Sequence, residues 1–199
     1  MDRADILREM RYEAGDVSAP IMREESVALL TEEVERLKPK RILEIGTAIG
    51  YSGTQMLFNA GEDTRLTTIE LDVFFAELAL KNFEKSGLRE RVRLIEGDAG
   101  EVVAMMEGRF DFILLDGPKG QYEHYRPYLK RLLNVGGILF ADNVLFKGYV
   151  NDYYIKHKHR TIVNSLTLFI RNMQKDPDFE TRLLETEDGI IIAKLKVES

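Results

Sequence analysis

Five short apolar runs, separated by helix-length segments, form the most constraining feature of this chain. They read RILEIG, RLTTIE, RVRLIEGD, FDFILLDG and VGGILFADN, at residues 41–46, 65–70, 91–98, 110–117 and 135–143. Near-continuous apolar runs are typical of parallel strands buried on both faces, and parallel neighbours need crossovers of a dozen or more residues. The pattern predicts an α/β fold, in which a mostly parallel sheet has helices on both faces.

Helical apolar spacing fills the segments around these runs. Four crossover helices are expected between them, at residues 51–59, 72–86, 99–106 and 122–133. Two helices at 5–12 and 24–37, separated by a breaker segment at 15–20, come before the first strand, and one at about 161–173 follows the last. Two closing runs, 179–186 and 189–197, are joined by a turn too short for a crossover, so they should pair antiparallel.

Length and composition favour a single domain over residues 1–199, with residues 1–38 as an N-terminal helical segment. No apolar stretch approaches the roughly 18 residues of a membrane span, and Met1–Met10 is charged where a signal peptide would be apolar. We expect a cytoplasmic protein with no membrane partner. The chain contains no cysteine, which excludes disulfides, thiolate metal sites, iron–sulfur clusters and a cysteine nucleophile.

The turn Glu44–Ser52 lies where the first strand ends and a helix begins. Gly46, Ala48 and Gly50 keep side-chain bulk out of this turn, so that a nucleotide-like ligand can lie against the backbone. An ordinary strand-to-helix turn explains the glycines equally well when they are considered alone.

Carboxylates at the next two strand ends favour the nucleotide interpretation. Glu70 closes the second run, where it can accept hydrogen bonds from both ribose hydroxyls, and Asp98 closes the third, near the expected adenine. Taken alone, each is more simply a helix N-cap or first-turn charge. The glycines do not form GxGxxG, and Glu44 would repel a pyrophosphate but suit a sulfonium. Together these features indicate S-adenosylmethionine rather than a nicotinamide cofactor.

A second set of polar residues closes the fourth and fifth runs. Asp116, Asp142 and Asn143 are all oxygen donors, and ends of neighbouring strands lie about 4.8 Å apart. Oxygen ligands suit a hard cation, so Mg²⁺ is expected, with Mn²⁺ or Ca²⁺ as alternatives. Turn chemistry in DGPKG and a capping role for Asp142 and Asn143 offer a simpler explanation.

Lys119 follows Asp116 by three residues. A bound cation and partial desolvation would both disfavour its ammonium form, which would make Lys119 a general base. Without the cation, a loop lysine is usually just solvated.

Four motifs in order, EIGTAIGYS, GDA, DFILLDGPKGQY and GGILFADNV, resemble those of the catechol O-methyltransferase-type family. The resemblance covers roughly Ala19 to the C-terminus. It implies a metal- and S-adenosylmethionine-dependent class I methyltransferase with a Rossmann-like fold. It also implies a seven-stranded, mostly parallel sheet of order 3-2-1-4-5-7-6, with a final antiparallel excursion.

The resemblance also assigns roles to residues. It implies that the methionine part of the cofactor is held by Met22, Glu44, Gly46, Thr47 and Ser52. Glu70 would hold the ribose, and Asp98 with Ala99 the adenine; Asp116 is assigned to the cofactor site and also, with Asp142 and Asn143, to the metal. Lys119 matches the lysine that takes the acceptor proton. A carboxylate that positions the second hydroxyl in the animal catechol enzymes has no counterpart in the C-terminal region.

The implied acceptor carries two vicinal oxygens, as in catechols, caffeoyl esters and 5-hydroxyuridine. DNVLFKG, a basic segment and DGIIIAKL most resemble the bacterial branch that methylates 5-hydroxyuridine at the tRNA wobble position to 5-methoxyuridine. That transfer is the expected function, and a small catechol-like phenol is the alternative acceptor. A pure binding module would not need Asp116, Lys119, Asp142 and Asn143 together.

A local basic patch would be needed for tRNA, because the formal net charge is −6. Its expected members are Arg23, Lys147, Lys156, Lys158 and Arg160, with Arg126 and Lys130 as an extension of the rim. Tyr149, Tyr153 and Tyr154 would stack on splayed bases. The alternative is a solvated charge run whose tyrosines pack between protomers. The family resemblance implies a homodimer, with the N-terminal helices or residues 149–155 as candidate contacts.

Overall fold

The computed structural model describes residues 2–151, 157–186 and 188–197. It divides into two compact units, an N-terminal unit, Met1–Ala99, and a C-terminal unit, Gly100–Ser199. The single domain expected over residues 1–199 stays a prediction.

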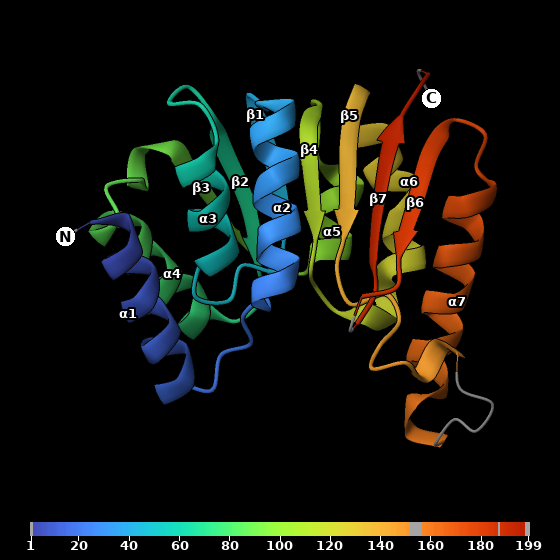
Figure 1. Ribbon diagram of the computed structural model, residues 1–199, viewed down its shortest axis with the longest axis horizontal. Coiled ribbons are helices and arrows are strands. Elements are labelled where there is room, and N and C mark those ends of the chain that lie inside the picture. The colour runs from blue at the N-terminus through green and yellow to red at the C-terminus, as the bar shows by residue number, and fades with distance from the viewer. Residues whose placement is uncertain (1, 152–156, 187, 198–199) are drawn as a thin grey trace. The chain divides into compact units, whose positions relative to one another are not determined.

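The N-terminal unit contains three parallel strands and four helices (Figure 1). In chain order these are α1 (Arg3–Asp16), α2 (Glu24–Leu37), β1 (Arg41–Ile45), α3 (Tyr51–Asn59), β2 (Arg65–Glu70), α4 (Val73–Lys85) and β3 (Val92–Glu96). β1 and β3 flank β2, and their carboxyl ends are in register, with Ile45 opposite Ile69 and Glu70 opposite Glu96. Each of these strands therefore ends beside its neighbour, which places the residues that follow them at a common edge.

Local sequence explains where these helices begin. Asp72 caps α4 by accepting the backbone N–H groups of Phe74 and Phe75 at 2.9 and 3.4 Å. Asp2 caps α1 in the same way through the N–H of Asp5 at 2.8 Å. This cap explains why α1 begins before the apolar spacing does, and the helix continues into the expected breaker segment as far as Asp16.

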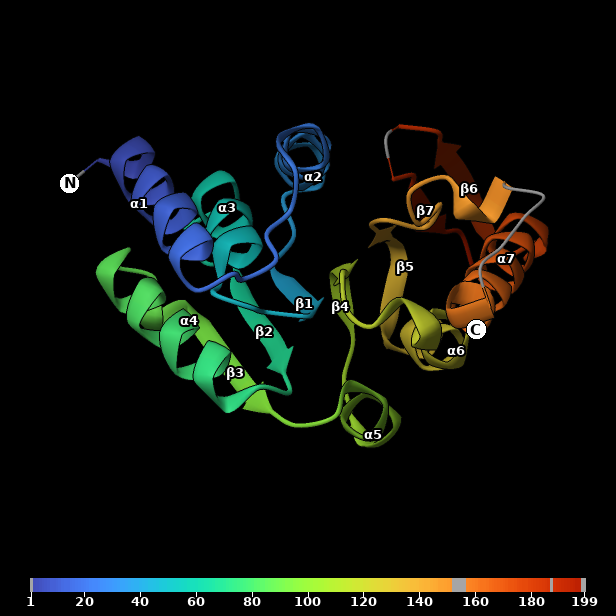
Figure 2. The ribbon, with the colours of Figure 1, turned by 90° about the horizontal axis from the view of Figure 1, so that it is seen from below.

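α3 contains one glycine, Gly53, and packs closely against its neighbours at that position. A Cβ built on Gly53 would lie 2.8 Å from Leu66 Cδ2, 3.1 Å from Phe83 Cζ and 3.1 Å from Glu44 Oε2. Contacts this short leave no room for a side chain. Gly53 therefore lets α3 approach both β2 and α4, and Figure 2 shows α3 and α4 running beside the three strands.

The C-terminal unit contains four strands and the helices that pack on them (Figure 1). In chain order these are α5 (Ala99–Met105), which begins at the unit boundary, β4 (Phe110–Leu115), α6 (Tyr122–Leu132), β5 (Leu133–Ala141), α7 (Arg160–Lys175), β6 (Phe179–Leu184) and β7 (Ile190–Leu195). β4 and β5 are parallel, with Leu115 opposite Ala141. β7 is antiparallel to both β5 and β6, as the short closing turn predicts.

The strand order is β3-β2-β1-β4-β5-β7-β6, which confirms the expected fold class. The strand pairs from β1 to β3 and from β4 to β5 are parallel, and only the pairs that involve β7 among those described are antiparallel. Crossover helices therefore connect the parallel strands, and a hairpin closes the sheet.

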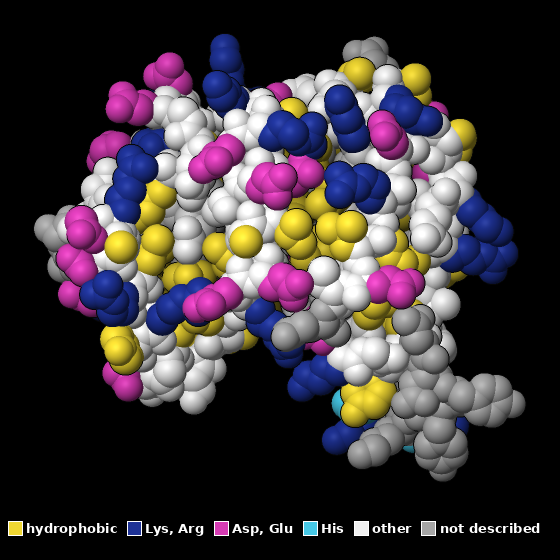
Figure 3. Space-filling view, viewed as in Figure 1, with side chains coloured by type: hydrophobic (Ala, Val, Ile, Leu, Met, Phe, Trp, Pro, Cys, Tyr) yellow, Lys and Arg dark blue, Asp and Glu magenta, His cyan; other side chains and the backbone are white. Residues whose placement is uncertain are grey.

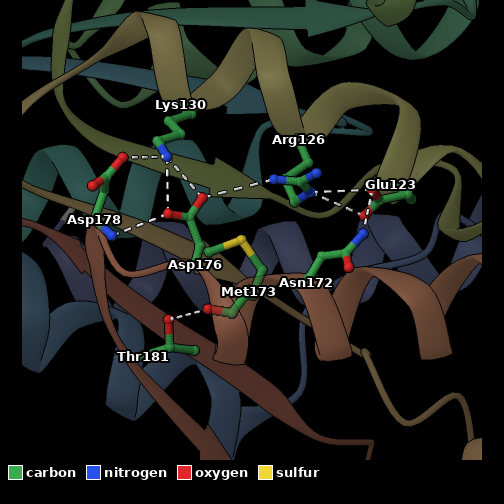
Figure 4. A network of polar contacts seen from close by, with 8 residues as sticks. All are labelled: Glu123, Arg126, Lys130, Asn172, Met173, Asp176, Asp178 and Thr181. Carbon is green, nitrogen blue, oxygen red and sulfur yellow. Dashed lines mark hydrogen bonds and ion pairs between the residues drawn. The ribbon is translucent and has the colours of Figure 1, made fainter. Parts of the chain in front are cut away.

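Lys130 joins α6 to the segment between α7 and β6 (Figure 4). Its ammonium donates to both carboxylate oxygens of Asp176, at 2.9 and 2.8 Å, and to Asp178 Oδ2 at 2.7 Å. The backbone N–H of Asp178 also donates to Asp176, at 3.0 Å. Because the Asp176 side chain is only 9% exposed, these contacts are shielded from water.

Arg126, one turn earlier on α6, extends this ionic network. Its Nε donates to both oxygens of Glu123 at 3.1 Å, and its Nη1 lies 3.8 Å from Asp176 Oδ2. Asn172 of α7 donates to Glu123 Oε1 at 2.8 Å, so the network ties α6 to α7 at two points (Figure 4). Arg126 and Lys130 therefore serve the packing of this unit. Their expected place on a basic rim for phosphates stays a prediction.

Removal of the Lys130 ammonium should destabilise the protein. Lys130→Met is expected to lower the free energy of unfolding in urea at pH 7 by about 1–3 kcal/mol, because the nearly buried Asp176 carboxylate loses its strongest donor. Lys81→Met, on the exposed side of α4, is the matched control and should change that free energy by less than about 0.5 kcal/mol.

The Lys130 effect should depend on pH. Burial alone raises the pKa of Asp176, but the hydrogen bonds from Lys130 and from the Asp178 N–H outweigh burial and hold that pKa below its usual value. A carboxyl whose pKa is lowered by folding stabilises the protein above its unfolded pKa, near 3.9, and loses that contribution as pH falls through the folded pKa. The difference between wild type and Lys130→Met should therefore shrink below about pH 4, and a constant difference down to pH 2.5 would contradict this assignment.

Candidate functional site

Glu44, near the end of β1, is a fully buried carboxylate in the N-terminal unit. Its Oε1 accepts the hydroxyl of Ser52 at 2.5 Å, and its Oε2 accepts the hydroxyl of Thr68 at 2.6 Å. Thr68 also shares a hydrogen bond with the Thr47 hydroxyl at 2.5 Å. Three hydroxyl groups thus tie the end of β1 to β2, to the loop after β1 and to the first turn of α3.

The loop between β1 and α3 is held in a left-handed path. Gly46, Ala48 and Gly50 all have positive φ, of 93°, 45° and 83°. At Gly50 a Cβ would lie 3.0 Å from Phe83 Cζ, so this position excludes a side chain on both conformational and steric grounds. The expectation of a turn with little side-chain bulk is confirmed.

Glu70 fastens this loop from the end of β2. Its Oε2 accepts the N–H groups of Thr47 and Ala48 at 3.1 and 2.7 Å, and its Oε1 accepts those of Leu71 and Asp72 at 2.9 and 3.0 Å. The four donors fill the acceptor positions that a carboxylate offers. A ribose bound there would take over positions that backbone N–H groups occupy in this structure.

The same unit contains Met22, Asp98 and Ala99, which are also assigned to the cofactor, whereas Asp116 lies in the C-terminal unit. Met22 is buried just before α2, Asp98 is exposed directly after β3, and Ala99 begins α5. The Gly97 N–H donates to the Glu70 carbonyl at 2.8 Å, so the chain leaving β3 is held beside the end of β2. Glu70 and Asp98 therefore lie on adjacent strand ends, as expected, while the side chains of Met22 and Asp98 stay assigned by prediction.

Asp116 and Asp142 lie side by side at the carboxyl ends of β4 and β5 in the C-terminal unit. The strands are in register up to Leu115 and Ala141, and the Asp142 N–H donates to the Leu115 carbonyl at 3.1 Å. The Asp142 side chain is buried, and it accepts the N–H of Asn143 at 2.9 Å. The structure thus places the three expected oxygen donors directly after two adjacent strand ends.

The chemistry of this set fits a hard cation. It offers two carboxylates and one amide oxygen, without nitrogen or sulfur ligands. In the described residues no group of three or more His, Cys, Asp or Glu side chains is placed to hold a metal ion. A cation at Asp116 and Asp142 would therefore need the Asn143 amide, and acceptor or water oxygens would complete its coordination.

Lys119 contacts the first of these carboxylates. Its Nζ lies 2.6 Å from Asp116 Oδ1 and 5.5 Å from the centre of the Tyr122 ring. Burial by itself lowers the pKa of Lys119, but Tyr122 and Asp116 outweigh burial and raise that pKa above its usual value. From the sequence, a bound cation is expected to lower the pKa of Lys119. Paired with Asp116 in this structure, Lys119 has a raised pKa instead.

Tyr122 is a site residue to which the sequence assigned no role. It is fully buried at the start of α6, and its hydroxyl lies within hydrogen-bonding distance of the Leu115 and Asp142 carbonyls, at 3.0 and 3.1 Å. Burial raises its pKa. Tyr122 thus holds the two strand ends together next to Asp116 and Asp142. In the sequence, only its place in the motif GPKGQY could have indicated this role.

The residues expected to bind tRNA are divided between the two units of the chain. Arg23 precedes α2 in the N-terminal unit, whereas Lys147, Lys158 and Arg160 lie in the C-terminal unit. Lys156, Tyr153 and Tyr154 lie outside the described residues. Tyr149 stacks on His159, with ring centroids 5.2 Å apart, and Phe146 contacts both rings. On the face seen in Figure 3, dark blue basic side chains are interspersed with magenta acidic ones.

Known proteins identify the class. A family model for O-methyltransferases matches residues 2–196. The caffeoyl-CoA O-methyltransferase of Populus kitakamiensis is 27% identical over 166 residues, which cover 79% of this chain and 71% of that protein. The catechol O-methyltransferase of Niastella koreensis is 36% identical over 117 residues, 57% of this chain and 53% of that protein.

A solved structure agrees with the sequence comparison. The O-methyltransferase of Bacillus cereus, crystallised in complex with SAH, superimposes with a TM-score of 0.88 at 25% identity, covering 98% of this chain and 93% of that one. This chain belongs to the O-methyltransferase family and is an S-adenosylmethionine-dependent enzyme. Within the described part of the chain, no helix has the length and apolar character needed to cross a membrane.

Loss of the Glu70 carboxylate should weaken cofactor binding. Glu70→Ala removes the acceptor for four backbone N–H groups, two of them in the glycine loop, so we expect the affinity for S-adenosylmethionine to fall about 10- to 100-fold in calorimetric titration. Glu96→Ala is the matched control, because Glu96 is the exposed strand neighbour of Glu70 in register. Equal affinities for the two variants would contradict the assignment of Glu70 to the cofactor site.

Proposed function

We propose that this enzyme methylates a phenolic hydroxyl of a small aromatic acceptor that carries two vicinal oxygens, with Mg²⁺ as the cation. The observation that carries the proposal is the in-register placement of Asp116 and Asp142, followed by Asn143, at the ends of β4 and β5. Two vicinal oxygens can complete the coordination that these three side chains leave open. When bound, the cation acts as a Lewis acid that lowers the pKa of the acceptor hydroxyl.

Acceptor binding is the task of the loop after β5. Phe146 and Tyr149 follow Asn143 by three and six residues and form an aromatic cluster with His159. Aromatic faces of this kind favour a planar acceptor. Tyr149, which the tRNA interpretation expects to stack on bases, packs against His159 in this cluster.

Lys119 is the proposed base. Methyl transfer moves the methyl group from sulfur to the acceptor oxygen, and the hydroxyl proton must leave for a basic group. Asp116 keeps the Lys119 ammonium charged in this structure. Lys119 can therefore accept a proton only once Asp116 is engaged elsewhere, so the two side chains work as a coupled pair.

Two considerations favour a small acceptor over tRNA. The curated relatives named above act, by their names, on caffeoyl-CoA and catechol. Arg126 and Lys130, expected at a phosphate rim, are engaged in the ionic network. Lys158 and Arg160 could still bind a phosphate group, either of a nucleotide-linked acceptor or of tRNA that carries the wobble 5-hydroxyuridine. The homodimer and the cytoplasmic location stay predictions.

Transfer of labelled methyl from S-adenosylmethionine tests the proposal. We expect Mg²⁺-dependent labelling of catechol or caffeoyl-CoA that EDTA abolishes, and a loss of at least about 100-fold in Asp142→Ala, because a buried ligand carboxylate is removed. Asp111→Ala, at the opposite end of β4, is the control. Labelling of 5-hydroxyuridine tRNA alone would replace the small acceptor with tRNA, and full activity in EDTA would overturn the cation site.

A further inference from the structure

The turn between β6 and β7 lies directly against the loop that follows Asn143. The Val144 N–H donates to the Gly189 carbonyl at 3.0 Å, and the Leu145 N–H donates to the Asp188 carbonyl at 2.7 Å. Gly189 has a φ of 73°, and a Cβ there would lie 2.3 Å from Leu145 Cγ. The contact therefore excludes any side chain at position 189.

The Asp188 carboxylate reaches both ends of this loop. Its Oδ1 accepts the Lys147 N–H at 2.8 Å, and its Oδ2 lies 3.5 Å from Nδ2 of Asn143. The second distance exceeds the usual 2.9–3.0 Å, so this contact orients the amide more than it binds it tightly. A single side chain thus fixes the loop backbone and faces the amide of a proposed cation ligand.

The loop needs such support because of its backbone conformation. Asn143, Phe146 and Lys147 have positive φ, of 57°, 46° and 57°. Asn tolerates this conformation, but for other side chains it costs about 1 kcal/mol or more per residue. Contacts from outside the loop must hold it, and the Asp188–Gly189 turn supplies them.

We propose that Asp188 is a positioning residue for the cation site, acting through Asn143. An amide side chain has one acceptor end and one donor end, and only its oxygen can ligate a cation. The NH₂ group of Asn143 faces the Asp188 carboxylate, which turns the amide oxygen away from Asp188. The reversed orientation would place that oxygen against a carboxylate, so Asp188 selects the ligating orientation. The inference rests on the proposed function of Asp116, Asp142 and Asn143 as cation ligands.

Mn²⁺ binding to the full-length protein, measured from the electron paramagnetic resonance signal of the free ion, tests this role without an activity assay. Asp188→Asn keeps an acceptor for the Lys147 N–H but replaces the carboxylate with an amide, and we expect Mn²⁺ affinity to fall about 10-fold or more. Asp111→Asn is the matched control. Asp111 is a β4 carboxylate that accepts Asn134 Nδ2 at 2.8 Å at the other end of the strands, and its substitution should leave Mn²⁺ affinity unchanged.

A double-mutant cycle separates positioning from loop support. If Asp188 acts through Asn143, Asp188→Asn should cause no further loss of Mn²⁺ affinity in an Asn143→Ala background. Additive losses, or an Asp188→Asn affinity within twofold of wild type, would overturn the proposal. If wild type binds Mn²⁺ no more tightly than Asp142→Ala, the cation site itself is wrong, and the role of Asp188 falls with it.

Discussion

In-register pairing of parallel strands is the constraint on which both clusters depend. β1, β2 and β3 end beside one another, and so do β4 and β5. The residues that follow each strand therefore lie next to those that follow its neighbour. A shift of one residue in a parallel pair would turn every following side chain to the opposite face. The Asp142 N–H to Leu115 carbonyl bond and the Tyr122 clamp hold the β4–β5 register where the carboxylates emerge.

The carboxylates near the glycine loop and those at the ends of β4 and β5 have different hydrogen-bond partners. In the N-terminal unit, the Glu44 and Glu70 carboxylates accept hydrogen bonds from hydroxyl and backbone N–H groups around the glycine loop. In the C-terminal unit, Asp116 is paired with Lys119. Carboxylates of the first kind suit a permanently positive ligand, and in the proposed function a cation would replace the Lys119 ammonium at Asp116.

Sequence reasoning recovered the fold because periodicity and strand ends are local signals. The apolar runs located all seven strands, and the residues closing them included Glu70, Asp116 and Asp142. It did not recover contacts between segments far apart in the chain. Tertiary packing sets the hydrogen bond of Thr68 to Glu44, the contacts of Tyr122 with two strand ends and those of Asp188 with the 143–147 loop. It also sets the ionic network of Lys130.

We propose that the strand ends of β4 and β5 hold a cation in this S-adenosylmethionine-dependent enzyme. A crystal structure with SAH and Mn²⁺, analysed by the anomalous signal of manganese, tests this claim most directly. We expect an anomalous peak within about 2.5 Å of oxygens of Asp116, Asp142 and Asn143. Bound SAH with no manganese at these residues, or with manganese elsewhere, would contradict it.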